Sequence, residues 1–265
     1  MFESAELGHK IDKVTYDKEV PKLREDLLNA QFDLAQKAEF PVIILVGGVD
    51  GAGKGETVNL LNAWMDPRHI QAHAMGDKTD EERARPPMWR FWRTLPPKGK
   101  IGVFFGSWYT APIVQRVMGK RKASELDQSI GEINHFEKML TNEGALIIKF
   151  WFHLSKEKQH KRLKGLEKNP KTRWRVTDLD WERFKLYDKI RKVSEHTLRA
   201  TSTAPILRAS KGDTCLYSVP TVMRCWSSST GQLMAPGIWS SANSEGLRAS
   251  MRASNSESCS TVARV

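Results

Sequence analysis

The chain has 265 residues, of which 40% are hydrophobic, and this length is sufficient for one sizeable α/β core. No apolar run is long enough to span a bilayer and the acidic, lysine-bearing start differs from a secretion signal, so we expect a soluble, cytoplasmic protein. The formal net charge of +11 predicts an anionic partner, and charge alone leaves nucleic acid, a membrane surface and a polyanionic substrate open.

The first 40 residues predict a helical segment packed against the core. Apolar residues from Val20 to Leu34 recur at helical spacing, and Pro21 suits the first turn of that helix. We expect this N-terminal segment to precede a single domain that covers residues 41–204.

The start of that domain, PVIILVGGVDGAGKGET, joins an apolar run to a glycine-rich turn that ends in lysine. Counted from Gly48, the spacing is G-x-x-x-x-G-K, the phosphate-binding P-loop pattern. Glycines let main-chain N–H groups converge on phosphate oxygens, and a helix that starts near Lys54 directs its positive end at the anion. A tight, empty strand-to-helix turn is the alternative. We predict a phosphate site made of Gly48, Gly51, Gly53, Lys54 and Gly55.

The residue after the P-loop lysine is Gly55, where nucleotide-hydrolysing P-loop proteins carry a Ser or Thr hydroxyl for magnesium. Asp50, inside the loop, is the alternative oxygen ligand or proton acceptor. Lys54 adds a mobile point charge for the transferring phosphate. Asp50 is therefore our candidate ligand for Mg²⁺, and Asp50 and Lys54 are candidate catalytic residues.

Residues 79–95 are dense in arginine and tryptophan. Thr79 and Glu82 form a capping-box signature that predicts a helix start, and prolines 86 and 87 must kink or restart that helix. The cations Arg83, Arg90 and Arg93 either face a phosphate cleft or form a solvated face with the tryptophans packed inward. The spacing does not decide between these interpretations.

Along the rest of the domain, strand-like and helix-like segments alternate. Weak alternation predicts a short strand over 70–75, and apolar runs predict strands over 101–105 and 145–152. The last of these reads as a strand covered on both faces. Helical spacing predicts helices over 113–118, 126–140, 155–168 and 178–198. Strands separated by helices imply a parallel, three-layer α/β/α sheet, which is the fold class that we expect.

Residues 155–178 carry many cations and follow a predicted strand. A run of charge is usually a solvated face, and this interpretation suits lysines 156, 158 and 161. In a P-loop kinase arrangement, however, this segment is where a basic lid folds over the phosphates. Our lid candidates are Arg162, Lys171, Arg173 and Arg175.

The composition changes after residue 204, where lysine almost vanishes and serine becomes frequent. No sustained period of 2 or 3.6 continues through residues 205–265, which predicts an irregular, disordered C-terminal tail. The abrupt shift also fits an out-of-frame or truncated end of the gene. The cysteines all lie in this tail and have neither metal-ligand nor disulfide-framework spacing: Cys215, Cys225 and Cys259.

Several of these segments together resemble the polyphosphate kinase 2 family. The resemblance rests on GGVDGAGKGET, RPPMWRFWRTLPPKGKIGVFFGSWY, INHFEKML, KFWFHLSKEKQHKR and DLDWERFKLYDKI, which occur in the family's order and spacing between about Val14 and Ala204. The chain looks most similar to the first half of the two-domain polyphosphate:AMP phosphotransferases, truncated or frameshifted after about residue 204.

The resemblance implies a thymidylate-kinase-like P-loop fold with a basic helical lid. It also implies transfer of the terminal phosphoryl group of inorganic polyphosphate to AMP or another nucleotide, with magnesium. The family has glycine after the P-loop lysine, as at Gly55, and Asp50 corresponds to the loop aspartate expected near magnesium and the acceptor phosphate. Arg90, Arg162 and residues 171–175 fall where the family places basic residues along the phosphate chain, which adds Arg90 to the catalytic candidates.

The chain departs from the family at FFGSWY, residues 104–109. Active domains read roughly F-D-R-S-W-Y here, so Phe105 and Gly106 stand where a second metal-binding carboxylate and an arginine are expected. Loss of a metal ligand removes charge neutralisation on which phosphoryl transfer depends. The resemblance implies that first halves of two-domain members share this change, with catalysis in the second half.

Three functions remain open. The first is a polyphosphate-dependent phosphotransferase, the second is a catalytically weak or inactive polyphosphate-binding or dimerising half, and the third is an ATP-dependent small-molecule kinase. The missing hydroxyl after Lys54 disfavours the third. Nucleic acid is disfavoured as a partner because no nucleic-acid-binding module is recognised, and no membrane partner is expected. The sequence does not decide whether the chain forms a homo-oligomer.

Overall fold

The computed structural model describes residues 2, 6, 11–202, 226–227 and 232–233. The predicted tail of residues 205–265 and its cysteines therefore lie outside the described residues, with two exceptions, and the suspected change of reading frame falls there too. The exceptions are the short strands β5 (Trp226–Ser227) and β6 (Gln232–Leu233), which pair antiparallel.

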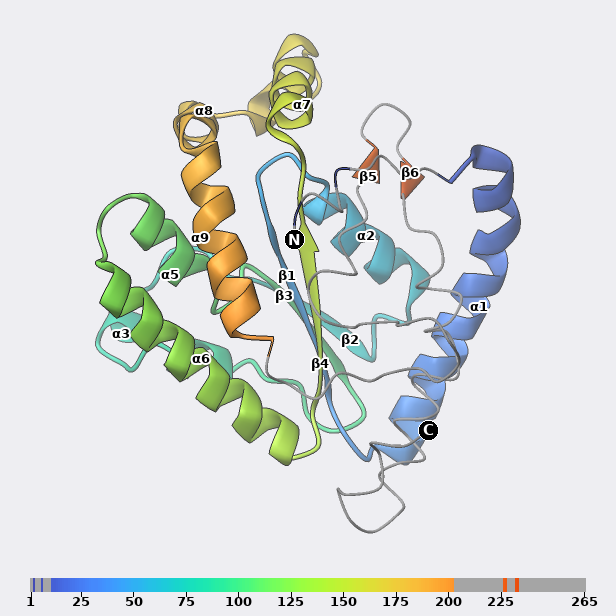
Figure 1. Ribbon diagram of the computed structural model, residues 1–265. Coiled ribbons are helices and arrows are strands. Elements are labelled where there is room, and N and C mark those ends of the chain that lie inside the picture. Colours follow the sequence, from blue (N-terminus) through green and yellow to red (C-terminus); the bar gives the residue numbers. More distant parts are fainter. Residues whose placement is uncertain (1, 3–5, 7–10, 203–225, 228–231, 234–265) are drawn as a thin grey trace.

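The centre of the fold is a parallel sheet with the strand order β2-β3-β1-β4 (Figure 1). The strands are β1 (Val42–Gly48), β2 (Ile70–Ala74), β3 (Ile101–Phe105) and β4 (Leu146–Phe152). Since every pair is parallel, the carboxyl ends of all these strands meet at one edge of the sheet. Ligands of open α/β sheets bind at this edge.

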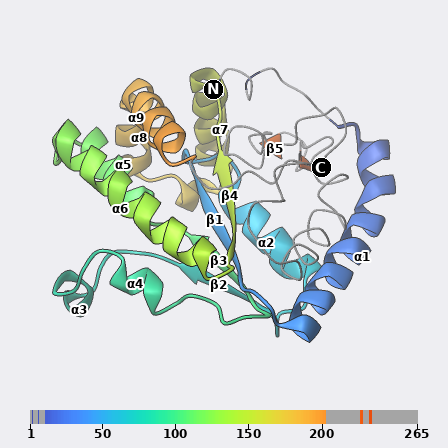
Figure 2. The same ribbon diagram turned by 60° about the horizontal axis from the view of Figure 1, so that its bottom comes forward.

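Helices cover both faces of the sheet (Figures 1 and 2). One face is covered by α1 (Lys13–Lys37) and α2 (Lys54–Trp64), and the other by α5 (Thr110–Val117), α6 (Ala123–Asn142) and α9 (Tyr187–Ala200). This confirms the predicted three-layer α/β/α fold. None of the helices in the described residues has the length and hydropathy needed to cross a membrane.

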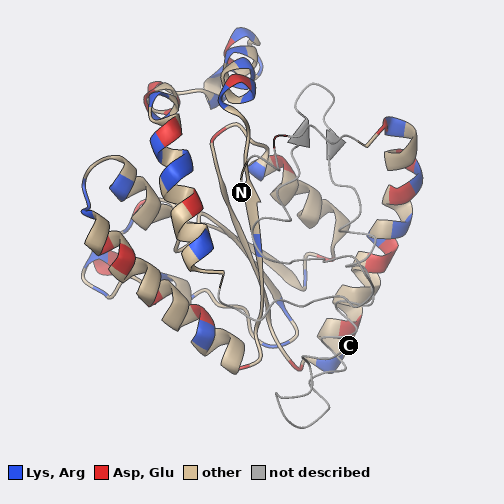
Figure 3. Ribbon diagram, viewed as in Figure 1, with Lys and Arg blue, Asp and Glu red and all other residues tan. Residues whose placement is uncertain are grey.

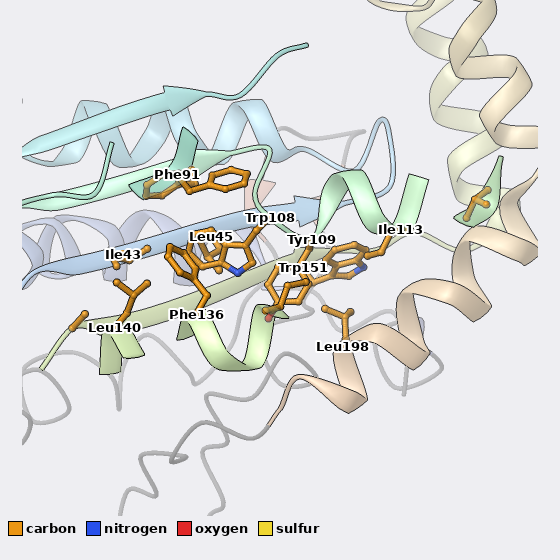
Figure 4. Close-up of a cluster of buried hydrophobic side chains, with 14 of the residues drawn as sticks. Ile43, Leu45, Phe91, Trp108, Tyr109, Ile113, Phe136, Leu140, Trp151 and Leu198 are labelled. Atoms are coloured by element: carbon orange, nitrogen blue, oxygen red, sulfur yellow. The ribbon is translucent and has the colours of Figure 1, made fainter. Parts of the chain in front are cut away.

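The alternation of β1 divides the core between the two faces. Ile43 and Leu45 join the cluster under α5, α6 and α9 that Figure 4 shows, with Trp108 and Phe136 at its centre. The intervening residues of β1 pack towards α1 and α2 with Leu34. β4 contributes to both clusters as expected, but most of its residues are only half-buried, since it lies at one edge of the described sheet.

Two helix predictions need correction. Pro21 lies inside α1 rather than in its first turn, because Asp12 caps the helix further upstream by accepting a hydrogen bond from the Thr15 amide at 3.0 Å. The single helix predicted over 178–198 is two helices, α8 (Asp178–Lys185) and α9, which meet at Leu186. The rings of α8 pack on His160, whereas α9 packs into the core, so the two helices follow different surfaces.

The arginine-rich segment forms two short helices. α3 (Asp80–Arg83) begins at the predicted capping box of Thr79 and Glu82, and α4 (Trp89–Trp92) follows the two prolines. The segment after β4 forms α7 (Lys156–Lys168) and the 3₁₀ helix η2 (Arg173–Arg175).

A buried ion pair fixes the loop that follows β3. The Glu137 carboxylate accepts hydrogen bonds from Trp108 Nε1 at 3.0 Å, from the Tyr109 hydroxyl at 2.6 Å and from Lys149 Nζ at 2.5 Å. Lys149 also donates to the main-chain oxygen of Thr201, at 3.0 Å. Burial and the neighbouring Glu137 raise the pKa of Tyr109, which keeps its hydroxyl a donor at neutral pH. This network joins α6, β4 and the end of α9 to that loop.

We expect His153 to make stability depend on pH. Its buried ring stacks on Phe2 and its Nε2 lies 2.8 Å from Glu6. Burial lowers the pKa of His153 more than Glu6 raises it, so the unfolded chain binds the proton more readily than the folded chain. The free energy of unfolding should therefore fall as pH drops below about 6.5, the ordinary pKa of histidine.

Thermal unfolding of the wild-type chain and of His153→Gln across that range tests this expectation. Glutamine keeps a donor for Glu6 but does not titrate, so the variant should lose part of the pH dependence. An identical pH profile for the two proteins would contradict the assignment.

Candidate phosphate-binding site

The turn between β1 and α2 has the geometry that the P-loop spacing predicts. Gly48, Gly51 and Gly53 adopt φ angles of 130°, 78° and 93°, in the region that favours glycine. A Cβ atom on Gly48 would lie 2.1 Å from the main-chain oxygen of Phe152, so the turn also passes too close to β4 for a side chain. The N-terminus of α2 follows directly and has no side-chain cap among the described residues, which leaves it able to face an anion.

Lys54 folds back across this turn. Its Nζ atom donates to the main-chain oxygens of Gly48 at 2.7 Å and Val49 at 3.0 Å, and lies 3.3 Å from Asp50 Oδ1. The side chain is 18% exposed. The ammonium group is therefore held against the main chain of the loop itself.

Asp50 is the carboxylate of the loop, and cations lie on both sides of it. Lys54 and Arg183 each approach one of its oxygens to 3.3 Å, and the Asp50 main-chain oxygen accepts from Gln159 Nε2 at 2.9 Å. Burial opposes ionisation of Asp50, but the two cations outweigh it and lower the pKa. Asp50 is therefore an anion at neutral pH.

Helix α7 and η2 bring arginines to the first turn of α2. The Arg162 and Arg175 guanidinium groups lie 3.7 and 3.3 Å from Glu56 Oε1. A Cβ atom on Gly51 would lie 3.4 Å from Arg162 Cγ, so this face of α7 packs directly on the loop. Figure 3 shows the lysines and arginines of α7 beyond the carboxyl end of β1.

The site includes residues that the sequence did not single out. Arg183 lies on α8 among alternating charges, with no spacing that separates it from solvent-facing arginines. Glu56 follows the P-loop lysine by two residues, and its position in the first turn of a helix was its only signal.

The remaining predicted residues have partners outside the loop or are exposed. Arg90 pairs with Glu82 at 3.3 Å and donates to the main-chain oxygen of Gly76 at 3.0 Å, so its partners belong to the segment after β2. Lys171 and Arg173 are exposed. No interaction in the described part of the chain joins Arg90, Lys171 or Arg173 to Asp50 or Lys54.

Neither interpretation of residues 79–95 holds fully. Arg83 and Arg93 are exposed and pair with Asp80 and Glu81, as a solvated face would. The tryptophans are not simply packed inward: Trp92 is 53% exposed, and the ring of Trp89 lies beneath the guanidinium groups of two arginines, Arg85 and Arg93.

The loop after β3 supplies no carboxylate to the site. Phe105 ends β3, and Gly106 follows with a φ angle of 84°, where a Cβ atom would make a tight contact of 3.0 Å with the main-chain oxygen of Met75. In the described part of the chain, no group of three or more His, Cys, Asp or Glu residues is arranged to hold a metal ion. Asp50 is the carboxylate of this loop, and Mg²⁺ is commonly bound through one or two carboxylates together with phosphate oxygens and water, so Asp50 is the residue that fits such an ion.

A family model described as polyphosphate kinase 2 matches residues 10–209. The chain belongs to the polyphosphate kinase 2 family. It is 56% identical over 202 residues to a polyphosphate:AMP phosphotransferase of Pseudomonas aeruginosa, a match that covers 76% of this chain and 41% of that protein.

Solved structures agree with this family assignment. A crystal structure described as a polyphosphate kinase 2 from Pseudomonas aeruginosa PA01 superposes with a TM-score of 0.69 at 53% identity. The match covers 77% of this chain and 41% of that one. A polyphosphate kinase 2 from Arthrobacter aurescens gives a TM-score of 0.74 at 24% identity over 93% of this chain and 82% of that one, which supports the fold alone. The chain thus spans about two fifths of the length of the polyphosphate:AMP phosphotransferases that it matches.

Proposed function

We propose that the chain binds inorganic polyphosphate at the P-loop and transfers a phosphoryl group from it to AMP or another nucleotide. The observation that carries this proposal is the convergence of four cations on the P-loop and the first turn of α2, in a member of the polyphosphate kinase 2 family: Lys54, Arg162, Arg175 and Arg183. A string of linked phosphates needs several cations in a row, whereas a single phosphate does not. Relatives named polyphosphate:AMP phosphotransferase support the choice of substrates.

Each group has a defined part in this proposal. The amides of the first turn of α2 and the Lys54 ammonium hold the phosphate nearest the loop. Arg162 and Arg175, within the predicted lid of residues 155–178, neutralise the next part of the chain. Asp50 would hold Mg²⁺, which supplies additional charge neutralisation when bound. Arg90 would contribute only if a phosphate group replaced Glu82 as its partner.

The proposal is tested by incubating the purified chain with long-chain polyphosphate, Mg²⁺ and AMP and measuring ADP. ADP formation that depends on polyphosphate is the expected result. Turnover with ATP in place of polyphosphate would instead indicate an ATP-dependent small-molecule kinase, which Gly55 disfavours because it has no hydroxyl for magnesium. A cytoplasmic location belongs to the same proposal, because AMP is a cytoplasmic metabolite.

A second candidate is a polyphosphate-binding half with little or no turnover of its own. The observation that favours it is the hydrocarbon side chain of Phe105 and the tight turn at Gly106, where the family resemblance leads us to expect a carboxylate and an arginine. Salt-dependent retention on immobilised polyphosphate without ADP formation would identify this function. Absence of both retention and turnover would exclude both candidates.

A further inference from the structure

Glu56 lies at the point where the P-loop helix meets α7 and η2. It is in the first turn of α2, two residues after Lys54, and its side chain is 34% exposed. An acidic residue at a helix N-terminus is ordinary, because it complements the helix dipole. What is not explained by the dipole is that arginines from two other elements approach the same carboxylate oxygen.

Those arginines belong to the proposed polyphosphate site. Arg162 comes from the face of α7 that packs on the loop, and its side chain is 17% exposed, whereas Arg175 comes from η2 and is 47% exposed. A carboxylate and a phosphate group offer the same chemistry to a guanidinium group: anionic oxygens that accept charge-assisted hydrogen bonds. The Glu56 carboxylate therefore takes the position beside these arginines that one phosphate group of a polyphosphate would take.

The same arrangement recurs within the loop. Asp50 neutralises Lys54 and Arg183 as Glu56 neutralises Arg162 and Arg175. Since both acids are part of the protein, they compete with any incoming anion at the high effective concentration of a tethered group. A polyanion must displace such a competitor before it engages the arginines.

We propose that Glu56 is an internal competitor of polyphosphate, which holds α7 and η2 on the P-loop helix when no substrate is bound and releases Arg162 and Arg175 when a phosphate group replaces it. The inference rests on the proposed function, since polyphosphate is the competing anion. Glu56 is a positioning residue, and its effect on binding is exerted through the arginines.

The test compares polyphosphate affinities of full-length variants by titration at one low salt concentration. Glu56→Gln keeps the size of the side chain but removes the competing charge, so it should bind polyphosphate about three- to tenfold more tightly than the wild type. Glu25→Gln is the matched control, because it makes the same charge change at an exposed position on α1. It should change the affinity less than about twofold, the size expected of a screened surface charge.

A double-mutant cycle with Arg175→Gln separates competition from general electrostatics. If Glu56 acts through Arg175, the gain from Glu56→Gln should shrink to less than half in the Arg175→Gln background. A gain equal to that of Glu25→Gln, or one that is undiminished in the Arg175→Gln background, would overturn the inference.

A measurement without substrate keeps this inference separate from the proposed function. Without polyphosphate, amides of α7 and η2 should exchange hydrogen faster in Glu56→Gln than in the wild type, because the contact that holds them to α2 is lost. Unchanged exchange would refute the holding role even if the wild type binds polyphosphate. Failure of the wild type to bind polyphosphate would refute the proposed function, and with it the claim that polyphosphate competes with Glu56.

Discussion

Replacing Lys54 with alanine is expected to weaken polyphosphate binding by about 10- to 100-fold, the range that loss of a hydrogen bond to a charged group implies. The Lys54 ammonium lies against the loop, 2.7 Å from the Gly48 oxygen and 3.3 Å from the Asp50 carboxylate. Its removal takes away the point charge next to the first phosphate and leaves Asp50 to repel the anion. The measurement is a polyphosphate titration of the purified variant at low salt.

Lys100→Ala is the matched control for this experiment. Lys100 also bonds a main-chain oxygen, that of Arg68 at 2.7 Å, but it precedes β3 and so lies at the opposite edge of the sheet. Because both variants lose one positive charge, the difference between them reports the site and not the net charge. Equal losses of affinity in Lys54→Ala and Lys100→Ala would contradict a P-loop site.

Gly48→Ala is the substitution with the largest expected effect on stability. Its Cβ atom would lie 2.1 Å from the main-chain oxygen of Phe152 and 2.6 Å from that residue's nitrogen, which are parts of the neighbouring strand and cannot rotate away. The φ angle of 130° adds backbone strain for any residue other than glycine. Together these terms should cost about 3 kcal/mol or more of unfolding free energy, measured by urea denaturation.

Gly55→Ala provides the comparison within the same loop and helix. A Cβ atom there meets nothing within 4 Å, and alanine suits the first turn of α2 better than glycine does. We therefore expect unchanged or slightly raised stability. A Gly48→Ala variant as stable as Gly55→Ala would show that the loop does not have the described geometry.

The parts of the fold that could be predicted are those whose information is local. The strands, the P-loop turn and the capping box of Thr79 follow from apolar periodicity and from glycine and cap chemistry within a few residues. The boundary at Leu186 could not be predicted in this way, because no glycine or proline marks it. It arises where α8 and α9 pack on different partners.

The candidate site was predictable only in part, for the same reason. Lys54 and the glycines are contiguous in sequence, and Arg162 was identified from the expected position of a lid. Arg183 and Glu56 acquire their significance from contacts between α2, α7, η2 and α8, which no spacing within one segment encodes. Arg90 was expected at the phosphates, but the structure pairs it with Glu82, an acid from the neighbouring short helix.

The most direct test of a polyphosphate site at the P-loop is hydrogen exchange of the full-length chain with and without long-chain polyphosphate. We predict slower exchange in the first turn of α2 and across α7 and η2 when polyphosphate is present, with no change along α1. Protection confined to α1, or no protection near residues 54–57 at saturating polyphosphate, would contradict the account.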